Sequence, residues 1–147
     1  MKPTTEPRAL NAADPRNRRD TDDRAEDMNR LTIISFGFLH GEPPTADITQ
    51  DMRPFRDPHV DPAMRQLTGH DQPVIDKVLG TPGVWAVLNN LQRQVLRGPR
   101  PLTIAIGCAS GRHRSVVVAD QLALHIRRYG PVATLVHRDI HRPVETR

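Results

Sequence analysis

The chain has 147 residues, a length that fits one domain, and 37% of its residues are hydrophobic. Its net charge of +4 is uneven: residues 92–147 hold ten Arg against three acidic residues, whereas residues 31–91 hold four Lys or Arg against seven acidic ones. No apolar run is long enough to span a bilayer, no secretory pattern opens the chain, and a single cysteine excludes an internal disulfide. We therefore expect a cytoplasmic protein with no membrane partner.

The first thirty residues are expected to form a disordered tail that acts as a linker. They hold seven basic and seven acidic residues and almost no large apolar ones. Such a segment cannot bury enough surface to offset the entropy lost on ordering. We place an α/β domain at residues 31–140 and a flexible tail at 141–147, with fraying from residue 139.

Four segments in the remaining chain have the composition of β-strands. The first is β-branched and ends before Gly41, the second alternates weakly, and the third is a continuous apolar run, typical of a strand buried on both faces. These strands are expected at residues 31–38, 48–53, 102–107 and 132–137. Between the second and third, residues 54–62 contain three prolines and must form a turn or loop.

Three segments follow a helical period. The first, Asp71 to Gly80, has an N-cap candidate in Asp71 and a proline in its first turn. The second runs from Thr81, its expected N-cap, to Gly98, and the third covers residues 115–129. The order of elements predicts a small α/β domain with a mixed or parallel central sheet flanked by helices.

The turn at residues 108–115, CASGRHRS, follows a buried strand and opens a helix. In open α/β sheets ligands bind at the carboxyl ends of strands, and a helix N-terminus offers unpaired N–H groups and partial positive charge. Small residues allow the backbone to curl around an anion, and arginines match phosphate oxygens. The turn therefore predicts a phosphate-binding loop, made of Gly107, Cys108, Ala109, Ser110, Gly111, Arg112, His113, Arg114 and Ser115. No nucleotide P-loop sequence is present.

Cys108 and Arg114 also have the C-x5-R spacing of cysteine phosphatases, followed by a hydroxyl at Ser115. A helix N-terminus and cations stabilise a thiolate, so Cys108 is a possible nucleophile. Those phosphatases carry His where this chain has Gly107, and a cysteine at a strand end is commonly a small hydrophobe. His113 is equally open to a catalytic, orienting or structural role.

Several motifs taken together resemble one family. They are ISFGF at 34–38, D-x-R-x-x-x-D-P-H-x-D-P at 51–62, LTG at 67–69, AIGCASGRHRSV at 105–116 and HRD at 137–139. In this order they are similar to the C-terminal domain of the RapZ family, bacterial RNase adapter proteins of the amino-sugar pathway. The family's N-terminal P-loop domain has no counterpart in this sequence.

The resemblance implies an α/β fold, binding of glucosamine-6-phosphate and binding of small RNAs. It implies that His59 joins the 107–115 loop in the ligand pocket, near Asp51 and Arg53. Further supporting residues are Asp61, Thr68 and Gly69. Cys108, His113, His59 and Asp51 together hold the parts of a nucleophile, a base and an orienting group. The RNA-binding basic cluster is thin and consists of Arg127, Arg128, Arg138 and Arg142.

We expect a sensor or regulatory module that binds a small phosphorylated sugar rather than turning it over, with no cofactor and no metal. Scattered histidines and one cysteine give no zinc-binding spacing. One alternative is an RNA-binding adapter, with a small RNA or an RNase as partner. Another is an enzyme, a phosphatase-like hydrolase that uses Cys108. A homo-oligomer is compatible with the resemblance.

Overall fold

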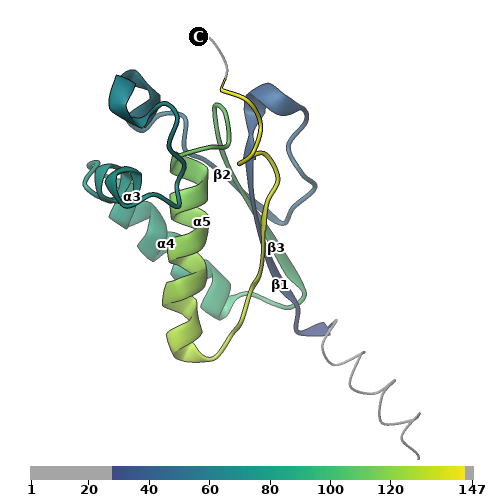
Figure 1. The fold of residues 1–147 in the computed structure, drawn as a ribbon. Coiled ribbons are helices and arrows are strands. Elements are labelled where there is room, and N and C mark those ends of the chain that lie inside the picture. The colour runs from purple at the N-terminus through teal and green to yellow at the C-terminus, as the bar shows by residue number, and fades with distance from the viewer. Residues whose placement is uncertain (1–27, 145–147) are drawn as a thin grey trace, which may run out of the picture.

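A four-stranded sheet forms the centre of the computed structural model, which describes residues 28–144 (Figure 1). All its strands are parallel, and their order is β2-β3-β1-β4. The strands are β1 (Leu31–Gly37), β2 (Ile48–Asp51), β3 (Leu102–Cys108) and β4 (Thr134–His137). The predicted α/β class is confirmed, and the sheet is wholly parallel. In a parallel sheet every strand delivers its carboxyl end to the same edge, where ligands bind.

Three helices cover one side of this sheet: α3 (Gln72–Leu79), α4 (Val84–Arg97) and α5 (Arg114–Ile126) (Figure 1). Short 3-10 turns occur at Phe38–His40, Pro58–Val60, Pro62–Met64 and Arg127–Tyr129. Two of them lie in the proline-rich segment, where Asp57 and Asp61 accept backbone hydrogen bonds two residues on. Asp before proline commonly caps such turns, so the segment is ordered despite its prolines.

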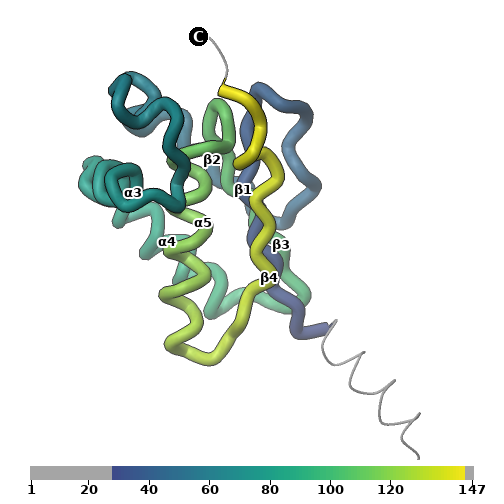
Figure 2. The backbone as a smooth tube through the Cα atoms, in the orientation of Figure 1, coloured from purple at the N-terminus to yellow at the C-terminus, as the bar shows by residue number. Residues whose placement is uncertain are grey.

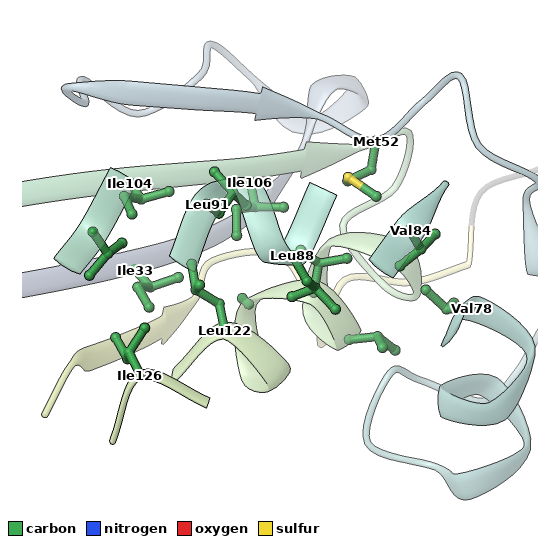
Figure 3. Packing of buried hydrophobic residues seen from close by; sticks show 14 of the residues in the cluster. Ile33, Met52, Val78, Val84, Leu88, Leu91, Ile104, Ile106, Leu122 and Ile126 are labelled. Carbon is green, nitrogen blue, oxygen red and sulfur yellow. The ribbon is translucent and has the colours of Figure 1, made fainter. Parts of the chain in front are cut away.

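The hydrophobic core lies between the sheet and the helices (Figure 3). Alternation along each strand sends Ile33 of β1 and Ile104 and Ile106 of β3 toward this layer. The helices contribute residues at helical spacing, such as Leu88 and Leu91 of α4. These side chains are 0–2% exposed, so burial of their apolar surface provides the main stabilising force.

Two sequence-based expectations fail at the ends of elements. Thr81 does not cap α4: its hydroxyl donates to the Lys77 carbonyl, closing α3, and Gly83 with φ +93° stands at the cap of α4. Residues from 139 on are not simply frayed, because Asp139 and Ile140 are 1% and 3% exposed. Of the tail expected at residues 1–30, residues 1–27 lie outside the described residues.

Candidate anion-binding site

The loop that joins β3 to α5 lies where the sheet strands end. Gly37, the last residue of β1, is in register with Cys108, and Asp51 of β2 is in register with Gly107. Beyond β2, the Met52 amide donates to the Gly107 carbonyl at 2.7 Å. Figure 2 shows the C-terminal segment that follows β4 passing the same edge. The sheet therefore brings together segments that are far apart in the sequence.

Glycine is required twice in this loop. Gly111 has φ +75°, and a Cβ there would lie 2.6 Å from the Gly37 amide nitrogen. A Cβ at Gly107 would lie 2.4 Å from the Phe36 ring. A side chain at this position, such as the histidine that cysteine phosphatases place before their nucleophile, would therefore require the Phe36 ring to shift.

Arg112 and His113 fasten the loop to the segment before α3. Arg112 donates through Nε to the Leu67 carbonyl at 2.9 Å, through Nη2 to the Gln66 carbonyl, and through Nη1 to the Arg142 carbonyl. His113 donates through Nε2 to the Leu67 carbonyl at 2.8 Å. The Gly69 amide donates in return to the Arg112 carbonyl. Two side chains that the sequence suggests as ligands thus hold the loop in place.

Arg114 fastens the loop to the segment after β2. Its side chain is 4% exposed, and its Nη1 donates to the carbonyls of Met52, Arg53 and Phe55 at 2.7–3.2 Å. Its Nη2 lies 3.3 Å from the carboxylate of Asp57. One buried guanidinium therefore shapes the proline-rich segment, because several carbonyls converge on a donor group with fixed geometry.

Two buried nitrogens of the loop have no hydrogen-bond partner among the described residues: His113 Nδ1 and Arg114 Nε. Leaving a buried polar group unsatisfied costs about 1–3 kcal/mol, so such groups in a folded protein point to a missing partner. Since Nε2 of His113 donates, Nδ1 is an acceptor in the neutral ring. Burial lowers the pKa of His113 and keeps the ring neutral.

Backbone amides complete the set of available donors. Within residues 28–144, the hydrogen bonds found do not use the amides of Ser110, Gly111 or Arg112 as donors. The first turn of α5 adds amides that no intrahelical carbonyl can reach. These amides lie beside the N-terminal end of α5, which contributes partial positive charge.

Asp139 also lies at this edge. In the sequence it is noted only as part of the HRD motif, with no role predicted in the site. Its side chain is fully buried and accepts a hydrogen bond from the Gly37 amide at 2.8 Å. Arg138 and Arg142 pair with its two oxygens at 2.9 and 3.2 Å. Its Cβ also lies 3.0 Å from a Cβ built on Gly111. A signal was available, because Asp139 stands two residues beyond the last strand, at the carboxyl edge where ligands bind in parallel sheets.

Cys108 is buried in the core cluster, at 1% exposure. Its Sγ lies 3.1 Å from Ser115 Oγ, as the C-x5-R-S spacing suggests. The hydrogen bonds of His113 and Asp51 lead elsewhere, to Leu67 and Arg53. His113 and Asp51, two of the residues expected beside the sulfur, thus have other hydrogen-bond partners.

Asp51 and Arg53 form a bidentate pair at the end of β2. Arg53 Nη2 and Nε lie 2.7–3.1 Å from the Asp51 carboxylate, and its guanidinium carbon lies 3.7 Å from the Phe38 ring centroid. The hydrogen bonds from Arg53 hold the pKa of Asp51 below its usual value. Both side chains are about half exposed, at 40% and 50%, and so can reach a ligand at this edge.

The other supporting residues lie in two places. His59 is half-buried in the turn after Asp57, through which it is linked to Arg114. Gly69 contacts the loop through Arg112, and the Thr68 amide donates to Asp71. Asp61 lies farther from the loop and pairs with Lys77 at 3.4 Å.

The four arginines expected to bind RNA do not form one patch. Arg138 and Arg142 lie beside the loop, both paired with Asp139. Arg127 and Arg128 lie in the turn at the far end of α5. A helix of 13 residues is about 20 Å long, so the two pairs are separated by roughly that distance.

The fold and this edge define a small parallel α/β domain with a glycine-containing loop at its strand ends. The sequence profile of the RapZ C-terminal domain matches residues 29–141, and the chain belongs to this family. The resemblance drawn from the motifs is therefore confirmed. None of the helices in the described part of the chain combines the length and apolar character of a membrane span.

Curated relatives from several bacteria share more than a third of the aligned residues. A nucleotide-binding protein of Thermobifida fusca is 39% identical over 122 residues, 77% of this chain and 41% of the relative. One from Cupriavidus taiwanensis is 41% identical over 125 residues, 78% and 43% of the two chains. One from Symbiobacterium thermophilum is 37% identical over 141 residues, which cover 88% of this chain and 45% of the relative. The chain thus spans less than half the length of these relatives.

Proposed function

We propose that this domain binds a small phosphorylated metabolite at the 108–115 loop, most specifically an amino-sugar phosphate such as glucosamine-6-phosphate, as a sensor or regulatory module. The observation that carries the proposal is the set of unused donors: the amides of Ser110, Gly111 and Arg112, and the buried Nε of Arg114. An anion at this end of α5 would accept hydrogen bonds from the amides. It would reach the buried Arg114 Nε, which is costly to leave without a partner, only after the loop opens.

The half-exposed carboxylate of Asp51 supports the amino-sugar part of the proposal. It lies at the end of β2, in register with Gly107, and its lowered pKa keeps it anionic at neutral pH. A carboxylate can accept hydrogen bonds from a protonated amine or from sugar hydroxyls. A ligand with phosphate at one end and an ammonium group at the other fits this separation of charge.

Binding without turnover is favoured over phosphatase chemistry. A phosphoryl group must reach the nucleophile, yet the Cys108 side chain is buried in the apolar core. A guanidinium clamps two phosphoryl oxygens through two adjacent N–H groups, and both Nη atoms of Arg114 here bind carbonyls and Asp57. The loop thus has the donors of a binding site and lacks an accessible thiolate.

The relatives are named nucleotide-binding proteins, so nucleotides are included as competing ligands. Their phosphates would use the same donors of the loop. RNA remains the other candidate, and the divided arginines would supply phosphate contacts at two ends of α5. RNA binding of this kind must weaken steeply with salt.

Calorimetric titration of the full chain tests the proposal. The ligands are glucosamine-6-phosphate, glucose-6-phosphate, inorganic phosphate and a nucleoside triphosphate, with released phosphate measured in the same samples. We expect saturable binding of the amino-sugar phosphate, weaker binding of inorganic phosphate, and no release. Release that disappears in Cys108→Ser would show an enzyme instead.

A pair of variants ties binding to the loop. Arg114→Lys keeps the charge but lacks Nε, and we expect it to weaken binding by about 1.5–3 kcal/mol, the net contribution of a charge-assisted hydrogen bond. Arg93→Lys, on the exposed face of α4, is the matched control and should bind as the parent does. Equal affinities in the two variants, with melting temperatures showing both folded, would refute the loop assignment.

A further inference from the structure

Three side chains from three separate elements meet beside α5. His70 precedes α3, Asp120 lies within α5, and His137 ends β4. Nε2 of His70 is 3.1 Å from Oδ2 of Asp120, and Nε2 of His137 is 2.8 Å from Oδ1 of the same carboxylate. Each imidazole thus faces a different oxygen, and one ligand atom from each residue lies within 4.8 Å of the other two.

The orientation of His137 is set by Ser35, a buried residue of β1 whose Oγ contacts His137 Nδ1. When Nδ1 carries the proton and donates it to this hydroxyl, Nε2 keeps its lone pair. Histidines that bind metals almost always donate their other ring nitrogen in this way, which fixes the tautomer and the ring plane. Nε2 is then free to bind an ion, which takes the place of the proton that Nε2 donates to Asp120 in the metal-free protein.

The exposure of the cluster suits an ion that enters from solvent. Exposure increases across the cluster, from 11% for the His137 side chain to 29% for Asp120 and 53% for His70. The cluster is therefore buried at His137 and open to solvent at His70. Within residues 28–144, the Asp120 carboxylate contacts these two imidazoles and forms no ion pair with a Lys or Arg. A cavity of about 240 Å³ also begins at Asp120.

We propose that His70, Asp120 and His137 bind a divalent transition-metal ion, with Zn²⁺ the best fit, leaving at least one coordination position for water. Two imidazoles and one carboxylate form a common zinc donor set, with bond lengths of about 2.0–2.2 Å. Donor atoms in such a tetrahedral site are about 3.3 Å apart. The two imidazole nitrogens lie at similar distances, 3.1 and 2.8 Å, from the oxygens of Asp120. Because the two imidazoles face different oxygens and the ligand atoms lie within 4.8 Å of one another, tetrahedral binding requires the exposed His70 ring to move closer.

A metal here would connect three segments that shape the anion-binding loop. His70 follows Gly69, whose amide donates to Arg112 of the loop. Asp120 belongs to the helix that the loop opens, and His137 is two residues from Asp139, which holds the Gly37 amide. Metal binding is therefore expected to stabilise the fold, because an ion that binds only the native state shifts the unfolding equilibrium.

Titration of the metal-stripped full chain with Zn²⁺ at neutral pH tests the site. We expect one Zn²⁺ per chain by calorimetry, a melting temperature that rises with Zn²⁺ concentration, and Co²⁺ absorption bands of a tetrahedral site of nitrogen and oxygen donors. His70→Ala and Asp120→Asn should each weaken Zn²⁺ binding by about 100-fold or more, whereas changing an outer partner costs about 10–100-fold.

His141→Ala removes an exposed histidine outside the cluster and is the matched control, expected to bind as the parent does. Because His70 is half exposed, its variant should fold even if Asp120→Asn does not. Absence of saturable Zn²⁺ binding, or equal loss in His141→Ala and His70→Ala, would overturn the proposal. The first result would leave the cluster as a network of hydrogen bonds only.

Discussion

The two ends of α5 carry arginines in very different states. At the N-terminal end, Arg112 and Arg114 are held by carbonyls of two other segments, and Arg114 is nearly inaccessible. At the C-terminal end, Arg127 and Arg128 are exposed in a one-turn 3-10 helix. Basic residues counted along the sequence are therefore not equivalent to positive surface, since burial turns an arginine into a structural element.

Among substitutions that test this difference between the two ends of α5, Arg114→Ala is expected to lower the free energy of unfolding most. It removes the donor to three carbonyls and leaves the Asp57 carboxylate, 21% exposed, without the guanidinium. Removing one partner of a buried pair costs about 3–5 kcal/mol. Urea denaturation should show this fall in unfolding free energy, and a loss below about 1 kcal/mol would mean that the guanidinium is not holding the segment.

Asp139→Asn should have the next largest effect. The carboxylate is fully buried and serves the Gly37 amide, Arg138 and Arg142. Asparagine keeps the shape but loses the charge and one acceptor, so we expect a loss of about 1.5–3 kcal/mol in unfolding free energy. Asp76→Asn, on the exposed face of α3, is a matched control, and similar losses in both would argue against an organising role for Asp139.

Gly111→Ala tests the backbone of the loop. A residue with a Cβ pays about 1–2 kcal/mol in the left-handed region, and here the Cβ also meets the Gly37 amide. We expect a loss of about 2 kcal/mol in stability together with weaker phosphate binding. Gly41→Ala, at φ +125° and ψ −176°, meets no neighbouring atom within 4 Å, so it is a control for backbone strain without a steric contact. Unchanged phosphate affinity in Gly111→Ala would show that the loop is not the site.

The pH dependence through His113 is a smaller effect. Burial lowers the pKa of His113 below its unfolded value of about 6.5, so the unfolded chain binds more protons as pH falls through 6.5. Its contribution to stability is therefore complete above this pH and declines below it, with a slope of at most about 1.4 kcal/mol per pH unit. His113→Gln should flatten the stability profile between the two pKa values, and an unaltered profile would exclude His113 as the source.

The smallest effect is expected at the far end of α5. Replacing both Arg127 and Arg128 by alanine changes exposed side chains of a short turn. Such substitutions usually alter the unfolding free energy by less than about 0.5 kcal/mol. If thermal denaturation showed a loss near that of Arg114→Ala, the contrast between the two ends of the helix would be wrong.

The sequence by itself determined the class of fold and the family. Within residues 28–144, continuous apolar runs and helical periods place the four strands and the helices α3, α4 and α5 within a few residues, because these patterns reflect local burial. The family follows from motifs that keep their order along the chain. The sequence is less accurate at helix ends. Thr81 lies between α3 and α4, and its hydroxyl bonds to the end of α3 instead of capping α4.

Only the tertiary structure decided which way the charged side chains face. A local pattern cannot indicate that Arg112 and Arg114 meet carbonyls more than forty residues away, or that Asp139 lies under the loop. The expectation of no metal rested on spacing along the chain, whereas His70, Asp120 and His137 approach one another only when the sheet and α5 pack. Sequence patterns record local preference, and long-range contacts between polar groups depend on the assembled fold.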